Sequence, residues 1–242
     1  MSAMPSGSSG VTTVPQLALF QARRPRRTAY DVHAVSQPAR AFTGDFYFTH
    51  KHKDRLWFAV GDVSGKGINA AVLMAMIQDE LEHRITSCAN CGCDPAATMA
   101  RLHEFLRPVL PSNKFASAVI GYASDDGHLV VANAGHPAPV IVRRDGTTDL
   151  VDSTGPVVGI LPAPRWRSSI RLFGRGETLV LYSDGVIEAE SPDGAEFGIE
   201  GLQRVARGTT AVAVGDAIVT AVDEHARGKR GDDLTLVVVR RG

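Results

Sequence analysis

The order of strand-like and helical segments constrains the fold of this 242-residue chain more than any other feature. Short runs rich in β-branched and aromatic residues form two blocks, at 30–60 and 115–183, and one further run stands at 234–241. Helical periodicity and helix-start signals indicate helices between these blocks. Because helices do not alternate one for one with strands, the pattern predicts an α+β fold, in which two packed antiparallel β-sheets are flanked by helices in an αββα sandwich.

The helical segments are recognised by their spacing and their caps. Leu73, Ile77, Leu81 and Ile85 recur at four-residue steps after Gly67. A second helix is expected over 95–106, where an aspartate N-cap precedes a proline, and two more are expected over 198–206 and 214–226. These segments are long enough to cover the outer faces of the two sheets.

The chain divides into a short arm and one large domain. Residues 1–28 begin with Ser, Gly, Thr and Pro and end in a basic cluster, so they are expected to form a flexible N-terminal arm. Residues 29–242 show no internal repeat and no linker, and they are predicted to form a single domain.

Charge and hydropathy exclude several classes of partner. The chain has 26 basic and 26 acidic side chains, so no overall field favours nucleic acid or an anionic membrane. No apolar run approaches the ~18 residues of a membrane span, and no secretory signal is visible. We therefore expect a cytoplasmic protein without nucleic-acid or membrane partners.

The three cysteines, Cys88, Cys91 and Cys93, lie in one segment, CANCGC. An odd, clustered set does not make a disulfide framework, whereas three thiolates are a partial zinc site that lacks its fourth ligand. The favoured interpretation is a polar loop between two helices.

The motif VGDVSGKGINAA, at 60–71, resembles a phosphate-binding P-loop at first sight. Its glycine spacing is one residue short, and Gly67 follows Lys66 where a P-loop requires Ser or Thr. In addition, Asp62 would repel a phosphate held by the loop. An acid at the end of an apolar strand favours a site for a hard cation, which takes oxygen ligands.

Other acids occupy similar places near the ends of predicted strands. Asp45 stands beside a strand, Asp184 follows one, and Asp232 and Asp233 open the last one. One such acid is typical of an ordinary turn, but together with Asp62 they could converge on one rim of the sandwich. Carboxylates held by rigid strands around a pair of cations would support phosphoryl hydrolysis. Held close without metal, they are expected to repel one another, and some of their pKa values are expected to be raised.

Four motifs carry a resemblance to a known family. GDVSGKGINAA (61–71), NAGHPAP (133–139), LYSDGVIEA (181–189) and DDLTLVVV (232–239) occur in this order. They resemble the signature blocks of the bacterial SpoIIE-like branch of the PPM, or type 2C, metal-dependent Ser/Thr protein phosphatases. The resemblance covers about 30–240 and implies the same sandwich, the PPM-type phosphatase fold.

The resemblance also implies a set of metal ligands, which serve as the catalytic acids. By position, Asp62 corresponds to the carboxylate that bridges two ions, and the backbone carbonyl of Val63 corresponds to the next ligand. Asp45 is similar to the acid of the second ion, and Asp184 and Asp232 are similar to those that complete the first. The implied cofactors are two Mn²⁺ or Mg²⁺ ions.

Neighbouring residues receive other roles. Asp233 is expected to orient the site, and His136 is interpreted as a packed turn histidine. Lys66 is a candidate phosphate-binding cation, with solvent exposure as the alternative. The chain departs from the family pattern at Thr43 and Phe48, and it has no histidine after the bridging aspartate, so the general acid stays open.

The function implied by the resemblance is hydrolysis of phosphoserine or phosphothreonine by a two-metal-activated water. The implied substrate is a phosphorylated anti-sigma-factor antagonist with a STAS domain, in a bacterial signalling pathway. A homodimer is compatible with the sequence, and relatives place a regulatory element where this chain has its arm. The alternative is a catalytically inactive PPM-fold module that binds partners.

Overall fold

The structure is a computed structural model, and it describes residues 29–39, 43–65, 68–87 and 93–242. Within these residues the strands form two five-stranded sheets, and all neighbouring strands are antiparallel. None of the helices in the described part is long and apolar enough to cross a membrane.

The two sheets combine strands from distant parts of the chain. Sheet A has the order β1 (Tyr30–Gln37), β10 (Leu234–Arg241), β9 (Thr178–Tyr182), β6 (Val140–Val142) and β7 (Thr148–Leu150). Sheet B has the order β2 (Asp45–His52), β3 (Arg55–Val63), β4 (Ala116–Ser124), β5 (His128–Ala134) and β8 (Ser169–Leu172). The first and last strands of the chain are thus paired in the same sheet.

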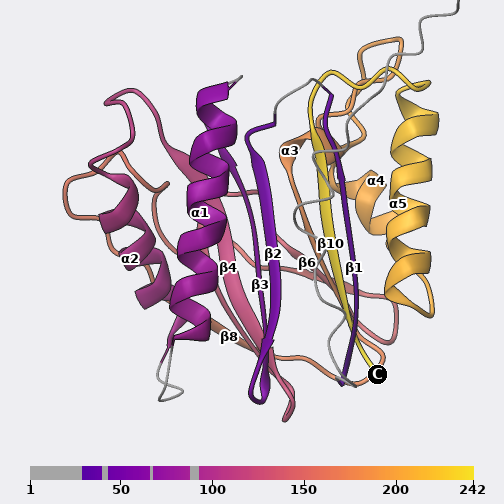
Figure 1. Ribbon diagram of the computed structural model, residues 1–242. Coiled ribbons are helices and arrows are strands. Elements are labelled where there is room, and N and C mark those ends of the chain that lie inside the picture. Colours follow the sequence, from indigo (N-terminus) through magenta and orange to yellow (C-terminus); the bar gives the residue numbers. More distant parts are fainter. Residues whose placement is uncertain (1–28, 40–42, 66–67, 88–92) are drawn as a thin grey trace, which may run out of the picture.

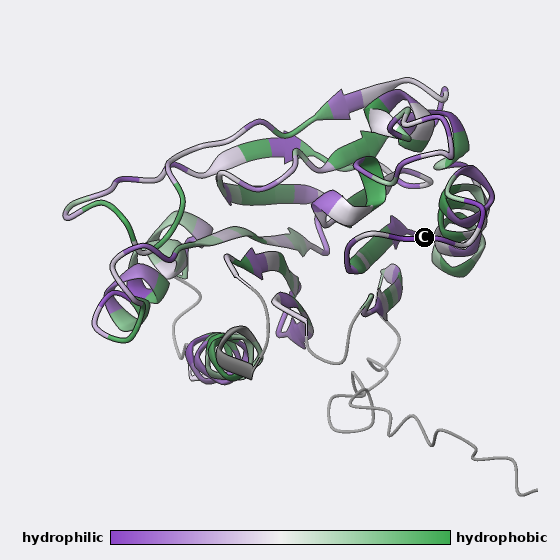
Figure 2. Cartoon of the chain, turned by 90° about the horizontal axis from the view of Figure 1, so that it is seen from above, coloured by the Kyte–Doolittle hydropathy of each residue, from purple (hydrophilic) through white to green (hydrophobic). Residues whose placement is uncertain are grey.

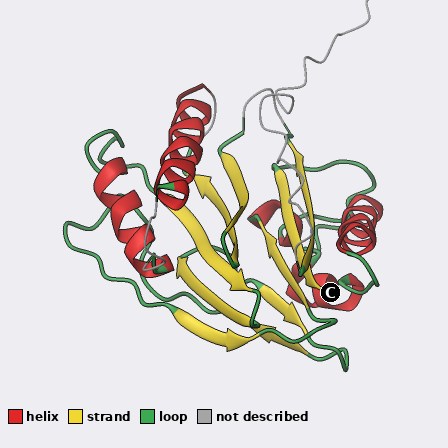
Figure 3. Ribbon diagram, turned by 60° about the horizontal axis from the view of Figure 1, so that its bottom comes forward, coloured by secondary structure: helices red, strands yellow, loops and turns green. Residues whose placement is uncertain are grey.

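Helices cover the outer faces of both sheets, as the sequence predicts (Figure 1; Figure 3). Sheet B is covered by α1 (Ile68–Thr86) and α2 (Pro95–Leu106). Sheet A is covered by α3 (Asp184–Ile187), α4 (Gly198–Val205) and α5 (Ala211–His225). The observed fold is therefore the predicted α+β sandwich.

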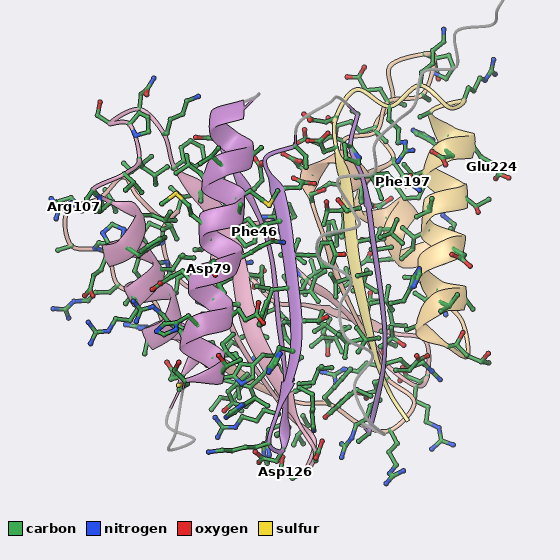
Figure 4. All side chains as sticks on the ribbon, in the orientation of Figure 1. Phe46, Asp79, Arg107, Asp126, Phe197 and Glu224 are labelled. Atoms are coloured by element: carbon green, nitrogen blue, oxygen red, sulfur yellow. The ribbon has the colours of Figure 1, made fainter. Side chains whose placement is uncertain are left out.

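Alternation along the strands creates three apolar layers. In β3, Leu56, Phe58 and Val60 face the other sheet, whereas Trp57 and Ala59 face the helices. Since side chains alternate between the two faces of a strand, one strand contributes to both layers. Figure 2 shows these hydrophobic strands between the helices, and Figure 4 shows the labelled Phe46 between β2 and α1.

Local signals explain the helix starts and some boundary differences. Asp94 accepts a hydrogen bond from the Ala97 amide at 3.1 Å, which makes it the predicted N-cap of α2. The helix α5 begins at Ala211 instead of the predicted 214, because the Thr210 side chain caps it. The short elements β7 and α3 were not predicted.

Candidate metal centre

The end of β3 and the start of β2 place two acids directly opposite each other. Asp45 and Asp62 are cross-strand partners in the antiparallel register, so their side chains project to the same face of sheet B. Since Val60 on that face packs between the sheets, both acids face sheet A. The sequence motif suggests a turn at Asp62, but β3 extends to Val63, so a central strand holds this acid.

Sheet A brings its acids to the same end of the sandwich. Asp184 opens α3 directly after β9, and Asp232 and Asp233 directly precede β10. These two segments are fastened together, because the Ser183 hydroxyl accepts from the Thr235 amide at 2.9 Å and donates to the Asp233 carbonyl at 3.2 Å.

A close backbone approach also joins these segments. A Cβ atom on Gly185 would lie 2.0 Å from the carbonyl oxygen of Asp233, so only glycine fits between them. The acid after β9 and the acids before β10 are therefore neighbours in a rigid arrangement.

The backbone at Gly44 forms a cradle for two oxygen atoms. A Cβ atom at this position would lie 2.6 Å from Asp62 Oδ1 and 2.7 Å from the carbonyl oxygen of Val63. The Val63 amide also donates to the Gly44 carbonyl at 3.2 Å. Two predicted ligand oxygens thus converge on one small space that glycine leaves open.

The electrostatics of Asp45 are those of a buried acid with too few donors. Burial raises its pKa to about 8, hydroxyl groups of Thr235 and Ser183 lower it, and the charges of Asp62 and Asp233 raise it. Its Oδ2 atom is buried and has no hydrogen-bond partner among the described residues. An orphaned carboxylate oxygen of this kind is suited to a cation ligand.

Burial also dominates at the neighbouring acids. It raises the pKa of Asp62 to about 6, followed by the charges of Asp184, Asp232 and Asp233. Burial also raises the pKa of Asp184, and the charge of Asp232 is the next largest cause that raises it. The raised pKa values confirm the sequence-based expectation, but mutual repulsion is a smaller cause than the loss of solvent.

The donor set fits a hard divalent cation by its chemistry. Carboxylate and carbonyl oxygens are the ligands that Mg²⁺ and Mn²⁺ take, and both the Gly44 cradle and the orphaned Asp45 oxygen offer such atoms. Within the described residues, however, no three Asp, Glu, His or Cys side chains are gathered closely enough to hold an ion.

Several other predicted residues can now be placed. Asp233 Oδ1 accepts from the Ala39 amide at 2.7 Å and so holds the segment after β1 at this end. Lys66, Cys88 and Cys91 lie outside the described residues. Cys93 packs against the core beneath α1 and α2 and is disulfide-bonded, although the sequence pattern did not indicate a disulfide framework.

His136 is the packed turn histidine that the sequence suggests. It is buried in the connection between β5 and β6, and burial lowers its pKa to about 4. Ser183, Thr235 and Ser117, all near the acids, were not singled out from the sequence. The sequence signal that could have identified them is a polar residue near the end of an apolar strand.

A hollow in the described surface lies elsewhere. A cavity of about 620 Å³ lies beside α2 and is lined by Arg107, Pro162 and Trp166 among others, without any of the predicted ligand acids. Large apolar pockets are the usual first candidates for ligand sites, but the concentration of buried acids favours the open end of the sandwich.

Comparisons with known proteins show which chains and folds this protein resembles. The chain is 27% identical over 231 residues to the phosphoserine phosphatase RsbU of Bacillus subtilis, which covers 93% of the chain and 68% of RsbU. The structure of the PP2C phosphatase domain of SpoIIE from Bacillus subtilis matches with a TM-score of 0.75 and 19% identity, over 87% of this chain and 63% of that one. The structure of RsbX in complex with magnesium matches with a TM-score of 0.67 and 16% identity, over 88% and 96%.

The sandwich of two antiparallel sheets flanked by helices is the fold of PP2C-type phosphatases. Within that class, the family model described as stage II sporulation protein E (SpoIIE) matches residues 52–242. The chain therefore belongs to the SpoIIE family. The chain spans about two thirds of RsbU and of the SpoIIE chain, so these relatives contain further sequence.

Proposed function

We propose that this protein is a metal-dependent phosphoprotein phosphatase that hydrolyses phosphoserine or phosphothreonine. The observation that carries the proposal is the meeting of the buried Asp45 and the half-buried Asp62 of one sheet with acids of the other, at one end of a SpoIIE-family fold. These acids have no role in the packing of the apolar layers, and their burial raises their pKa values. Strongly perturbed acids that converge in this way mark functional sites.

The residues divide into two groups of ligands. Asp62, the Val63 carbonyl and Asp45 would hold one ion, and Asp184 and Asp232 would complete a second site with Asp62 as the shared ligand. The proposed cofactors are Mn²⁺ or Mg²⁺, supported by the oxygen donors and by the magnesium in the similar RsbX structure. When bound, such ions supply Lewis acidity and activate water for attack on phosphorus.

The protein contributes rigidity and charge. Asp62 is held between β2 and β4 by backbone pairing on both sides, so its position does not depend on a loop. The hydroxyl groups of Ser183 and Thr235 from the other sheet lower the pKa of Asp45 and so favour its charged form. The cluster of carboxylates repels a phosphate dianion by itself, which makes substrate binding dependent on cations.

The proposed substrate is a phosphorylated STAS-domain protein, an anti-sigma-factor antagonist. Its support is the family membership and the similarity to RsbU. The alternative, an inactive module that only binds such a partner, would bind the phosphoprotein without turnover.

Hydrolysis assays with purified protein distinguish these two functions. A chromogenic phosphate ester and a phosphoserine-containing STAS protein should both be hydrolysed with Mn²⁺, and a chelator should stop both reactions. Asp184→Asn should lose activity, whereas Glu224→Gln, a matched change at an exposed acid on α5, should keep it. Binding of the phosphoprotein with no turnover in any metal would reject the phosphatase and support the inactive module.

A further inference from the structure

His136 is fixed in place by its own turn. Its backbone amide donates to Asn133 Oδ1 at 2.9 Å, and Asn133 Nδ2 donates to the His136 carbonyl at 3.1 Å. Asn133 is fully buried. These two hydrogen bonds fix the backbone of His136, and they orient its imidazole ring independently of the contacts that the ring makes.

The ring joins the two sheets through both nitrogens. Its Nε2 atom lies 3.0 Å from the carbonyl oxygen of Tyr182 at the end of β9. Because a carbonyl only accepts, Nε2 carries the hydrogen. Since burial lowers the pKa of the ring to about 4, Nδ1 is unprotonated at neutral pH and accepts from the Ser117 hydroxyl at 2.8 Å. The buried ring is therefore neutral, with a defined tautomer.

Both partners of the ring are adjacent to proposed metal ligands. Ser117 is the cross-strand partner of Asp62 in sheet B. Tyr182 ends β9 in sheet A, two residues before Asp184. One neutral side chain thus connects the Ser117 hydroxyl, on the strand beside the proposed bridging acid, with the backbone just before an acid of the opposite sheet.

We infer that His136 is a positioning residue that sets the separation of Asp62 and Asp184 for metal binding. The inference rests on the proposed function. Acids of like charge on two facing sheets tend to move apart, and a buried neutral link between their flanks opposes that movement. Residues that hydrogen-bond directly to metal ligands typically change metal affinity by ~10–100-fold when they are lost, and because the partners of His136 stand next to the ligands we expect an effect at the lower end of that range.

The other end of β4 offers a matched control. There, the Tyr30 hydroxyl of sheet A donates to the Ser124 carbonyl of sheet B at 2.5 Å, also in a buried position. Tyr30→Phe removes an intersheet hydrogen bond from the same strand, far from the acids. Comparison of the two ends separates sheet-to-sheet stability from positioning of the ligands.

The test measures Mn²⁺ binding directly, by calorimetry and by the metal-induced shift in melting temperature. Ser117→Ala and His136→Gln should raise the Mn²⁺ dissociation constant about tenfold or more and reduce the melting shift. Ser117→Thr, which keeps the hydroxyl, should stay within about threefold of wild type. Tyr30→Phe should lower the apo melting temperature but keep wild-type Mn²⁺ affinity.

The outcomes separate this inference from the proposed function. An Mn²⁺ affinity that Ser117→Ala leaves unchanged, with the apo melting temperature lowered as in Tyr30→Phe, would overturn the positioning role. If His136→Gln fails to fold, Ser117→Ala decides alone. A wild-type protein that binds Mn²⁺ without hydrolysing any phosphoprotein would reject the proposed phosphatase, while the affinity comparison would still decide the role of His136.

Discussion

The two ends of sheet B hold aspartates in opposite electrostatic conditions. At the end where β2 begins, burial raises the pKa of Asp45 to about 8. At the other end, hydrogen bonds from the side chains of Ser124 and His128 lower the pKa of Asp126 to about 2. Figure 4 shows the labelled Asp126 at this second end, beyond the strands. The pKa values of these two aspartates thus differ because Asp126 accepts hydrogen bonds, whereas Asp45 has lost its solvent.

The two ends of sheet B also differ in the basic side chains that surround their acids. Near Asp126, Lys51 pairs with Asp125, and Arg241 donates to the Asp125 carbonyl at 2.9 Å. At the other end, no Lys or Arg of the described residues pairs with Asp45 or Asp62. One end is therefore arranged for stability, and at the other Asp45 and Asp62 have no basic partner among the described residues, so a cation would neutralise their charge.

The largest expected effect is a loss of turnover, and it is tested by the same Asp-to-Asn substitution at each end of sheet B. Asp62→Asn should lower turnover by ~1000-fold or more, equivalent to about 4 kcal/mol, because it removes the proposed shared ligand. The apo protein should be at least as stable as wild type, since a buried acid with a raised pKa is replaced by a neutral group. Turnover assays and thermal melts with and without Mn²⁺ measure both quantities.

Asp126→Asn is the matched control. It should keep turnover within about twofold, because Asp126 is exposed and distant from the acid cluster. Near-normal turnover in Asp62→Asn would remove Asp62 from the site, and with it the shared-ligand assignment.

The next effect concerns the pH dependence of apo stability. An acid whose folded pKa is raised binds more protons in the folded state, so stability falls as pH rises from its unfolded pKa through its folded pKa. For Asp45, with a pKa raised to about 8, the window runs from about 4 to about 8. Between pH 6.5 and 8 the free energy of unfolding of the apo protein should fall by about 2 kcal/mol.

The titration of His136 limits the pH range in which the change in stability can be assigned to Asp45. Its pKa is lowered to about 4, so its own contribution is lost as pH falls below about 6.5 and is constant above. Denaturant unfolding of the apo protein at pH 6.5 and 8 is the measurement. Asp45→Asn should abolish the slope, saturating Mn²⁺ should reverse it, and a wild-type slope that persists in Asp45→Asn would assign it to another group.

A smaller effect tests the cradle at the start of β2. Gly44→Ala places a methyl group within 3 Å of Asp62 Oδ1 and of the Val63 carbonyl, so these oxygens must shift. Mn²⁺ affinity should fall about tenfold, or about 1.4 kcal/mol. Gly231→Ala is the control, because a Cβ there meets nothing within 4 Å. Equal affinities of the two variants in calorimetry would show that the cradle does not hold the ion.

Much of this arrangement is predictable from local sequence. The apolar pattern of β3 and the Asp-Pro start of α2 predict the bounds of these two elements within a few residues. The grouping of strands and helices along the chain predicts the sandwich. The SpoIIE family, predicted from four short motifs, is confirmed by the family model. The ligand roles of the acids stay predictions.

Other features depend on contacts between distant residues and have no local signal. The link from Ser117 through His136 to Tyr182 joins residues up to 65 positions apart, and only the packing of the two sheets brings them together. The tight fit of Gly185 against Asp233 is likewise a tertiary contact. Sequence periodicity predicts which face a residue occupies but not its partner across the sandwich.

The smallest expected effect concerns the arm. Residues 1–28 lie outside the described part of the chain, and we predict that they regulate the enzyme instead of catalysing the reaction. Every proposed ligand lies between residues 45 and 232, and the Ala29 carbonyl, which accepts from the Gly242 amide at 2.8 Å, stays in place when the arm is removed. Deletion of 1–28 should keep Mn²⁺-dependent turnover of a small phosphate ester within about threefold, less than 1 kcal/mol.

The same deletion should leave the pH slope of the apo protein unchanged, because the slope arises from acids of the sandwich. Parallel assays of the full chain, the deletion variant and Asp62→Asn give the comparison, with melting temperature as the control for folding. A loss of turnover as deep as that of Asp62→Asn, in a deletion variant that still melts like the full chain, would place part of the catalytic machinery in the arm. The acid end of the sandwich would then be incomplete without it.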